Sequence, residues 1–215
     1  MKSPQCSYDG CKEDGHIHIT SPIGMEGDWC KPHYTLVRRK LNYIKFQDKI
    51  NFPPIYKKAT LDDFDTEILS DVDKSKSLYI FGESGCGKTH LASALIHNDY
   101  VNKNEYEIEF ITMSKLLQRI KRTYNNDEGE TEDEIIERFS KVKHLYIDDI
   151  GVEKPTDWVI NIIYLILDER YTHELRTVFT SNLDLNQIKD RLGQRIASRV
   201  KGLGLVIEMG GGDRR

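Results

Sequence analysis

The segment that most constrains the fold of this chain is GESGCGKT, which runs from Gly82 to Thr89. It matches the phosphate-binding pattern G-x-x-x-x-G-K-[ST], with Gly87 and Lys88 directly before Thr89. The apolar, aromatic-rich stretch SLYIF precedes it, and THLASALIHNDYV after it has the apolar spacing of a helix. A chance match in a glycine-rich turn would lack this strand–loop–helix setting. The sequence therefore predicts a P-loop that binds the phosphates of a nucleotide.

The residue types in this loop suit phosphate chemistry. Glycines let the backbone turn its N–H groups inward, and the N-terminus of the following helix adds a positive dipole. We expect Lys88 to bridge the β- and γ-phosphates of ATP, and the Thr89 hydroxyl to bind Mg²⁺. Cys86 is interpreted as a tolerated small residue, and His90 as packing at the start of the helix. The predicted nucleotide-binding residues of this segment are Gly82, Glu83, Ser84, Gly85, Cys86, Gly87, Lys88, Thr89 and His90.

A second motif, KHLYIDDIG, supplies the acidic group that a P-loop needs to hold its metal ion. It predicts an apolar strand that ends at Asp148 and Asp149. Asp148 is expected to reach the Mg²⁺ shell, and Asp149 to orient or deprotonate the attacking water. Many P-loop ATPases carry glutamate at the second position, and aspartate is one methylene shorter. The motif therefore predicts slow ATP hydrolysis, suited to a timer rather than a motor.

Apolar strand candidates alternate with helical segments through the rest of the chain. Ser114 is interpreted as the N-cap of one helix, and Asp157–His173 as a long, largely buried helix. This alternation predicts an α/β fold with a mostly parallel sheet and a ligand at the C-terminal edge of its strands. The further strand candidates are Glu107–Thr112, Thr177–Asn182 and Leu203–Met209.

Three cysteines and a histidine near the start of the chain have the spacing of a metal site. Cys6-x4-Cys11 and Cys30-x2-His33 are two close pairs separated by a loop, and each pair can supply two corners of a tetrahedron. A segment this short and polar cannot build a hydrophobic core. Bound Zn²⁺ would therefore have to supply the free energy of folding. A disulfide is disfavoured because a cytosolic chain keeps its thiols reduced and three cysteines leave one unpaired. His16 and His18 remain alternative ligands.

Composition indicates a polar globular protein, with 38% hydrophobic and 31% charged residues. The longest apolar run, WVINIIYLIL, contains Asn161 and is shorter than the roughly 18 residues of a membrane span. The first residues include no apolar signal-peptide segment, so we expect a cytoplasmic protein without a membrane partner. Although the net charge is −4, the segments 34–58 and 186–215 are basic. They are compatible with a polyanionic partner, and also with a solvent-exposed surface that binds none.

Several motifs together resemble one family. The run LYIDDIGVEKPTDWVINIIYLILDERYTHELRTVFTSNLDLNQIKDRLGQRIASRV is similar to the DnaC/DnaI-type replicative helicase loaders and their IstB-like relatives, and YKKATLDDFD resembles that family's linker. The resemblance covers roughly Pro53 to Arg215. It implies an AAA+ P-loop core of three layers, with a five-stranded parallel sheet in the strand order 5-1-4-3-2 and without a helical lid after the last strand. It also implies self-assembly through the ATP sites, and delivery of a DnaB-type helicase to single-stranded DNA.

The resemblance also assigns roles to residues outside the P-loop. Asn182, at the end of FTSNL, matches the polar sensor 1 of AAA+ ATPases, and Arg199 in ASRV matches the arginine finger that completes a neighbour's site. The spacing of four places Arg191, Arg195 and Arg199 on one helix. GGDRR resembles the sensor 2 segment, so Arg214 or Arg215 is expected to contact the γ-phosphate.

The predicted organisation has a zinc-finger-like helicase-docking module at 1–41, a basic linker at 42–58 and an AAA+ ATPase domain at 59–215. The basic segment from Arg38 to Lys58 is compatible with a helix, a linker or a DNA-contacting stripe, and the sequence does not decide between them. Three other functions compete with the loader. They are an IstB-like transposition helper on duplex DNA, a zinc-dependent DNA-binding adaptor with incidental ATPase activity, and a nucleotide or polynucleotide kinase, which would need an acceptor-binding lid.

Overall fold

The structure is a computed structural model that describes residues 5–7, 11, 15, 17–20, 26–50, 52–102, 106–125, 129–151 and 156–210. The chain divides into two compact units, Met1–Asn51 and Phe52–Arg215. Within the described ranges, no helix combines the length and apolar character needed to cross a bilayer.

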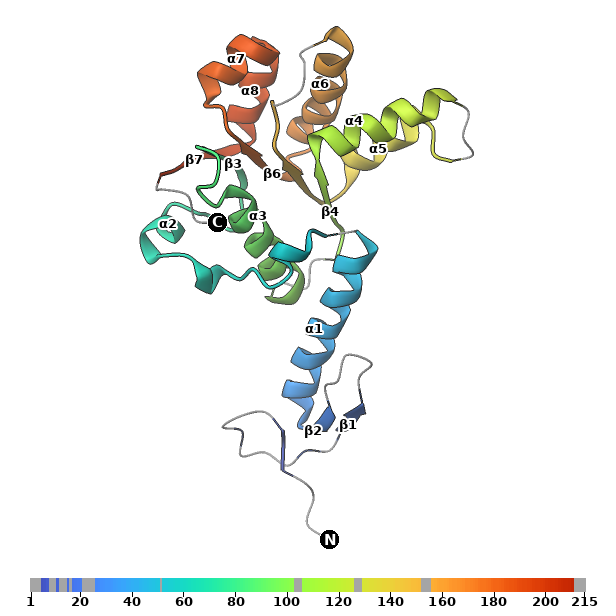
Figure 1. Cartoon of the computed structure of the whole chain (residues 1–215), viewed down its shortest axis with the longest axis vertical. Helices are drawn as coiled ribbons and strands as arrows, with labels where there is room; N and C mark the ends of the chain where they lie inside the picture. Colours follow the sequence, from blue (N-terminus) through green and yellow to red (C-terminus); the bar gives the residue numbers. More distant parts are fainter. Residues whose placement is uncertain are drawn as a thin grey trace. The chain divides into compact units, whose positions relative to one another are not determined.

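The first unit contains a hairpin followed by one long helix (Figure 1). Strands β1 (Ile17–Thr20) and β2 (Glu26–Trp29) pair antiparallel, and helix α1 (Lys31–Lys49) begins two residues after β2. Pro32 lies in the first turn of α1, where a missing backbone N–H costs nothing. No glycine or proline follows Pro32 before the end of α1. The helix therefore continues past Leu41, the predicted end of the finger module. Much of the predicted basic linker is therefore helical.

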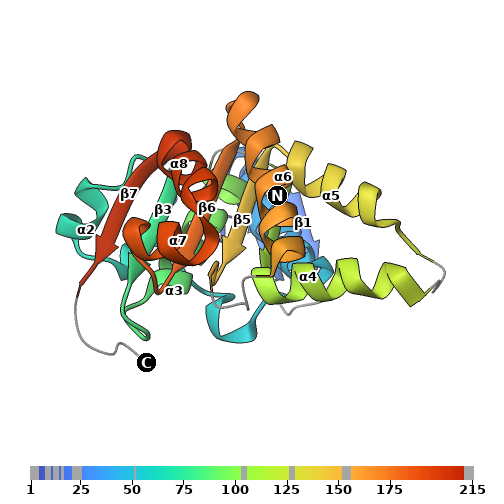
Figure 2. The same cartoon turned by 90° about the horizontal axis from the view of Figure 1, so that it is seen from above.

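The second unit is built on a five-stranded sheet with the order β4-β5-β6-β3-β7, in which every neighbouring pair is parallel. Numbered within this sheet, the order is 5-1-4-3-2, as the sequence predicted. Figure 2 shows β7, β3, β6 and β5 side by side across the sheet. The strands are β3 (Ser77–Gly82), β4 (Ile108–Thr112), β5 (His144–Asp148), β6 (Arg176–Ser181) and β7 (Gly204–Met209).

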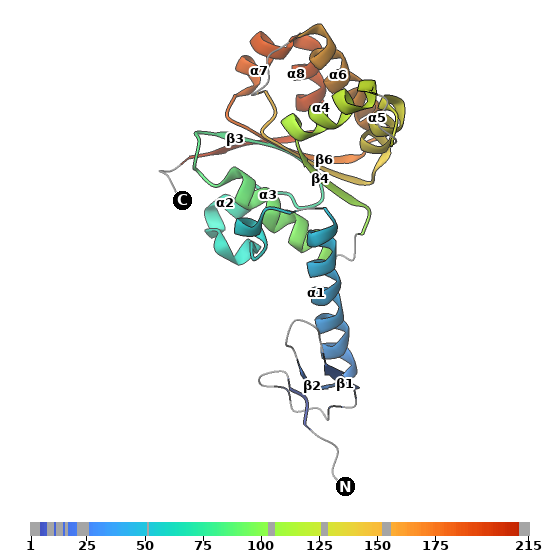
Figure 3. The ribbon, with the colours of Figure 1, turned by 45° about the vertical axis from the view of Figure 1, so that its right-hand side comes forward.

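Helices cover both faces of this sheet, which gives the predicted three layers (Figure 3). Helix α3 (Lys88–His97) lies on one face with α2 (Thr66–Ser70) and the short turns η1 (Pro54–Tyr56) and η2 (Leu61–Asp63). The central strands β5 and β6 are buried along their whole length, and this burial includes the polar side chains of β6 at Arg176, Thr177, Thr180 and Ser181. The other face carries α4 (Met113–Arg122), α5 (Glu132–Lys141), α6 (Asp157–Thr172), α7 (Leu185–Leu192) and α8 (Gln194–Leu203).

One fully buried arginine ties the helices of the second face to the sheet. Arg170 on α6 is 0% exposed, and its guanidinium donates to the backbone carbonyls of Phe139 at 3.0 Å, Val142 at 2.7 Å and Arg176 at 2.7 Å. Its Nε donates to the Thr177 hydroxyl at 2.7 Å. Burial lowers the pKa of Arg170 to about 9, which still leaves it cationic at neutral pH. The charge is therefore stabilised by neutral acceptors rather than by a carboxylate.

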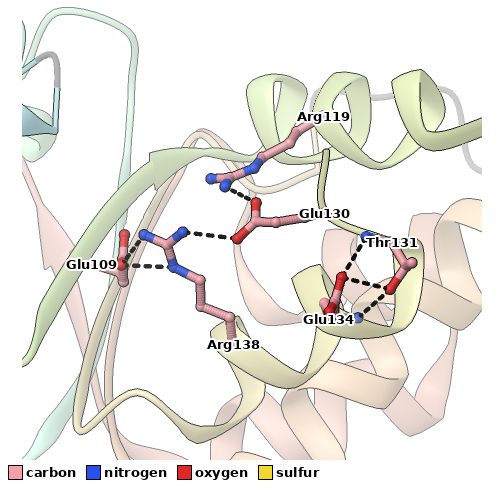
Figure 4. A network of polar contacts seen from close by, with 6 residues as sticks. All are labelled: Glu109, Arg119, Glu130, Thr131, Glu134 and Arg138. Carbon is pink, nitrogen blue, oxygen red and sulfur yellow. Dashed lines mark hydrogen bonds and ion pairs between the residues drawn. The ribbon is translucent and has the colours of Figure 1, made fainter. Parts of the chain in front are cut away.

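Helices α4 and α5 are linked by a polar network at the surface (Figure 4). The carboxylate of Glu130 pairs with Arg119 on α4 and, at 3.2 Å, with Arg138 on α5. Arg138 Nε also donates to Glu109 on β4 at 2.9 Å. Exposed ion pairs of this kind each contribute roughly 0–1 kcal/mol to the free energy of unfolding. The network therefore orients α4 and α5 more than it stabilises the fold.

The start of α4 differs from the prediction. Thr112, and not Ser114, is the N-cap, because its hydroxyl accepts a 3.3 Å hydrogen bond from the backbone N–H of Lys115. Strand β4 ends at Thr112 and the helix follows at once, so Ser114 already lies inside the first turn. The predicted cap was wrong by two residues.

Candidate functional site

The P-loop spans the turn between β3, which ends at Gly82, and α3, which begins at Lys88. Gly87 has φ 100° at the helix N-cap, a conformation that residues with a side chain rarely adopt. At Gly82 an added Cβ would lie 2.3 Å from the carbonyl oxygen of Met209 on β7, so only glycine fits beside that strand. The two positions explain why the loop needs glycine at its start and end. Glu83 and Ser84, at the tip, are exposed.

Lys88 lies inside the loop. Its Nζ donates to the backbone carbonyls of Gly82 at 2.9 Å and Glu83 at 2.7 Å, and the residue is only 5% exposed. The buried thiol of Cys86 lies 3.8 Å from the same nitrogen. A buried ammonium with two neutral acceptors is available to a stronger, anionic partner such as a phosphate.

A hydroxyl–carboxylate cluster joins three elements at the C-terminal edge of the sheet. Asp148, at the end of β5, accepts on one oxygen, Oδ1, a 2.8 Å hydrogen bond from Thr89 and a 2.5 Å hydrogen bond from Thr180 on β6. Burial raises the pKa of Asp148, and these two hydrogen bonds oppose the rise. The arrangement brings the two predicted Mg²⁺ ligands, Thr89 and Asp148, into direct contact. Hard oxygen ligands of this kind fit Mg²⁺.

Thr180 is a site residue that the sequence reasoning missed. Its side chain is 1% exposed, and its hydroxyl accepts a 3.0 Å hydrogen bond from the backbone N–H of Asp149 while donating to Asp148. Asp149 has φ 58°, a left-handed conformation that is uncommon for a residue with a side chain. Thr180 therefore holds both acidic residues. The available signal was a hydroxyl in a predicted strand, two residues before the expected sensor 1 residue Asn182.

Asn182 follows β6 directly and is exposed. Because β6 lies between β3 and β5, Asn182 emerges between the P-loop strand and the acidic strand.

His90 contacts the segment that precedes the P-loop. Its Nε2 lies 3.0 Å from Asp63 Oδ2, and its ring packs edge-on against Phe64 at 5.1 Å and beside Tyr56 at 6.1 Å. The hydrogen bond from the Thr60 backbone N–H is the largest cause that lowers the pKa of Asp63, and His90 adds to it. The predicted linker YKKATLDDFD is thus anchored to the first turn of α3.

The three arginines near the end of the chain do not share one helix. Gly193, at φ 97°, ends α7 and separates Arg191 from Arg195 and Arg199, which lie on α8. The predicted single helix was wrong, because spacing of four alone does not show a glycine in the left-handed region. Nothing lies within 4 Å of an added Cβ at Gly193, so its φ and not crowding favours glycine there.

Arg199 is held by α6. Its Nε donates to Asp168 at 2.6 Å, and its guanidinium lies 4.6 Å from the centre of the Tyr171 ring. About a third of its side chain, 32%, stays exposed. Arg195 lies 4.0 Å over Tyr164, one helical turn away. The predicted sensor 2 residues, Arg214 and Arg215, lie outside the described residues.

The four predicted zinc ligands form a cluster in the first unit. The ligand atoms of Cys6, Cys11, Cys30 and His33 all lie within 4.8 Å of one another, and none of the cysteines is in a disulfide. Sγ of Cys11 lies 3.8 Å from Sγ of Cys30, and Sγ of Cys6 lies 3.5 Å from Nδ1 of His33. A tetrahedral zinc site has sulfur–sulfur edges of about 3.8 Å and sulfur–nitrogen edges of about 3.5 Å. The donor set therefore fits Zn²⁺.

The neighbours of this cluster also suit a metal site. The backbone N–H of Cys30 donates to Sγ of Cys6 at 3.3 Å, a contact that stabilises a thiolate. His18 lies on β1 and its Nδ1 is 3.1 Å from Asp28 Oδ1, so it is not part of the cluster. His16 lies outside the described residues.

Comparisons with known proteins place the chain in a family. The sequence profile of the family described as IstB-like ATP binding protein matches residues 40–199. The replicative helicase loader DnaC of Buchnera aphidicola subsp. Baizongia pistaciae is 33% identical over 136 residues, which are 63% of this chain and 54% of that protein. The replicative helicase loader DnaI of Bacillus subtilis is 28% identical over 159 residues, 68% of this chain and 50% of that protein.

A solved structure agrees with the sequence relatives. A crystal structure of DnaI superposes with a TM-score of 0.59 at 26% identity, over 76% of this chain and 94% of that one. This chain spans about half the length of the curated relatives that it matches. The five-stranded parallel sheet, the P-loop between β3 and α3 and the profile match agree, and the chain belongs to the family of IstB-like ATP-binding proteins.

Proposed function

We propose that this protein is an ATP-dependent loader that binds a DnaB-type replicative helicase and helps to deliver it onto single-stranded DNA for the initiation of replication. The observation that carries the proposal is the contact of Thr89, Asp148 and Thr180 beside a P-loop, in a chain whose relatives are named replicative helicase loaders. It supports ATP binding at the sheet edge and a role shared with those relatives.

The ATP site would use residues already placed at that edge. The P-loop amides and Lys88 would hold the phosphates, and Thr89 and Asp148 would hold Mg²⁺, which supplies charge neutralisation. Asp149 would orient the attacking water and Asn182 would contact the γ-phosphate. The shorter reach of Asp149 favours slow hydrolysis, so that bound ATP acts as a switch.

Self-assembly would complete each site across a subunit boundary. Arg199 is partly exposed on α8 and fixed by Asp168, which suits a cation that is offered to the ATP of a neighbouring copy. Arg214 or Arg215 would serve as sensor 2 within the same chain. ATP binding between subunits would then favour the assembled state, and hydrolysis would release it.

The zinc-binding unit would dock the helicase. Cys6, Cys11, Cys30 and His33 would bind Zn²⁺ and fix the start of α1, so that the module from 1 to 41 presents a defined surface. Residues 42–58 would connect this module to the ATPase domain at 59–215.

The test is light scattering on a sizing column, with the full chain, the DnaB-type helicase of its own replication system, ATP, Mg²⁺ and Zn²⁺. We expect a stoichiometric complex that weakens in Lys88→Ala and in Cys30→Ser. Lys76→Ala is the matched control for the first variant, because Lys76 is an exposed lysine outside the site. No complex with wild-type protein would contradict the proposal.

A second candidate is supported by the family profile, whose description is IstB-like. A transposition helper of that kind would assemble with ATP on duplex DNA and would need no helicase. Filament or oligomer formation on duplex DNA, together with no helicase complex, would favour it. A helicase complex that Lys88→Ala leaves intact would instead favour an adaptor in which ATP hydrolysis is incidental.

A further inference from the structure

One side of α1 carries a straight row of basic residues. Lys31, Arg38, Lys45 and Lys49 follow one another at intervals of seven, seven and four residues, which returns each side chain to nearly the same direction on an α-helix. All four are exposed. We call these four residues the α1 basic row. With a rise of 1.5 Å per residue, it is about 27 Å long.

The positions between the cations are neutral and polar. Thr35 and Asn42 complete the same side of the helix, and both are exposed. All six positions lie within about 80° of arc at 100° per residue. Asp48, the one acid of α1, lies about 100° from Lys49 and about 60° from Lys45, so it borders the row without belonging to it.

The buried residues of α1 are on the other side. Val37, Tyr43 and Gln47 are the buried positions of the helix. His33, whose Nδ1 belongs to the zinc-ligand cluster, is also directed away from the row, at about 160° from Lys31. The metal cluster can therefore fix the helix without covering the basic side.

The four cations have no acidic partner within the described residues: no ion pair joins any of them to a described carboxylate. Elsewhere in the described residues, Lys141 pairs with Glu137 and Arg138 with Glu109. Four unpaired cations in a line are complementary to a line of negative charges.

A nucleic-acid strand is the partner that fits this geometry. Its phosphates repeat along one line, and contacts to them need no particular base sequence. A helix that enters the major groove of a duplex contacts both strands and base edges, which requires basic or base-reading side chains on two flanks. Of the other cations of α1, Arg39 is half-buried and Lys40 lies about 180° from Lys31, so the exposed cations of this side form a single line. It matches one strand followed along its backbone.

We propose that the α1 basic row binds the phosphate backbone of single-stranded DNA, in a contact that depends on salt and is independent of base sequence. The contact deepens the proposed loading function, because it names a DNA-binding surface in the zinc-binding unit, outside the ATPase domain. It needs neither ATP nor a helicase.

The experiment is a fluorescence-anisotropy titration of the full, zinc-loaded chain with a labelled 20-nucleotide oligo(dT), without nucleotide, between about 50 and 200 mM salt. Arg38→Gln with Lys45→Gln removes two contacts. Because each phosphate contact on a single strand contributes about 0.7 to the slope of log K against log salt, the slope should fall by about 1.4. At 0.1 M salt this is about a 25-fold loss of affinity.

Two control variants distinguish an effect of the α1 basic row from an effect of net charge or of unfolding. Lys40→Gln with Lys58→Gln makes the same change in charge at exposed lysines outside the row, and should leave the slope unchanged. Arg38→Lys with Lys45→Arg keeps the row charged and should bind as the wild type does. Equal slopes for the wild type, the row variant and the Lys40/Lys58 variant would overturn the proposal.

Two other outcomes would assign the row to a different partner. A larger loss with a 20-base-pair duplex than with oligo(dT) would mean that the row binds double-stranded DNA. Unchanged oligo(dT) binding with loss of the helicase complex would mean that it docks an acidic protein surface. Since the titration contains no ATP and no helicase, its failure is distinguishable from failure of the proposed loading function.

Discussion

Nε of Arg199 on α8 donates a 2.6 Å hydrogen bond to Oδ1 of Asp168 on α6, while Tyr171 of α6 lies under the guanidinium at 4.6 Å. An added Cβ at Gly202 would lie 2.6 Å from the Tyr171 ring, so α8 accepts this ring only because it has a glycine there. The proposed arginine finger is thus positioned by three residues of its own chain before any neighbour arrives.

Replacement of Asp168 should therefore affect assembly-dependent catalysis. In Asp168→Asn we expect kcat for ATP to fall several-fold at protein concentrations that allow assembly, with little change in KM, because the P-loop that binds ATP is untouched. Asp190→Asn, at an exposed aspartate on α7, is the matched control. Steady-state hydrolysis measured over a range of protein concentrations tests this, and equal kcat values for the two variants would contradict it.

The pair of Arg199 and Asp168 also predicts a change in the pKa of Asp168. The hydrogen bond from Arg199 is the largest cause that holds the pKa of Asp168 below its ordinary value. A carboxyl with a lowered pKa stabilises the fold above its ordinary pKa of about 4, and that contribution is lost as pH falls through the lowered value. In Arg199→Ala we expect the pKa of Asp168 to rise toward the ordinary value. NMR of the Asp168 carboxyl carbon over pH 2–6 measures this pKa. Arg195→Ala should change the pKa of Asp168 less than Arg199→Ala does.

Thr180 should matter for hydrolysis although it contacts no expected substrate atom. Thr180→Val removes one hydrogen bond to the Asp148 carboxylate and one from the Asp149 backbone, and hydrogen bonds to charged groups contribute about 1.5–3 kcal/mol. We expect kcat to fall at least tenfold and Mg²⁺-dependent ATP binding to weaken. Thr180→Ser keeps the hydroxyl and should restore both. Equal loss in the serine variant would indicate packing rather than positioning.

Arg170 should be among the most sensitive positions for stability. In Arg170→Met four backbone carbonyls and the Thr177 hydroxyl lose their donor inside the protein. We expect the free energy of unfolding to fall by about 3–5 kcal/mol. Arg195→Met, at an exposed arginine, should cost less than about 1 kcal/mol. Urea denaturation followed by circular dichroism tests the difference, and similar midpoints would contradict it.

Zinc removal should unfold the first unit selectively. Trp29 is 8% exposed and packs with Cys6 and Cys30, so its fluorescence reports on the cluster. In a Trp158→Phe background, which leaves Trp29 as the only tryptophan, we expect a chelator to shift the emission to longer wavelength. Elemental analysis should find one zinc ion per chain, and Cys11→Ser should lower that content. Unchanged emission after chelation would contradict the metal assignment.

The fold was largely predictable from the sequence because its strongest signals are local. Each strand is a short apolar run, and the P-loop fixes the strand and the helix on either side of it. The predicted Glu107–Thr112 and Leu203–Met209 each begin one residue before β4 and β7, and the predicted Thr177–Asn182 is shifted by one residue at both ends from β6. The strand order came from the resemblance and is confirmed by the sheet.

The parts that sequence reasoning missed depend on contacts between distant residues. Thr180 lies 32 positions from Asp148, and Asp168 lies 31 positions from Arg199. No local periodicity predicts such pairs. The helix break at Gly193 depends on its φ of 97°, and a regular spacing of arginines conceals it. These features follow from packing and not from local pattern.

The close approach of Gly82 to Met209 couples the start of the P-loop to the edge strand β7. The two residues are opposite each other in the register of β3 and β7, and an added Cβ at Gly82 would lie 2.3 Å from the Met209 carbonyl oxygen. A displacement of β7 would therefore also move the backbone at which the nucleotide-binding loop begins.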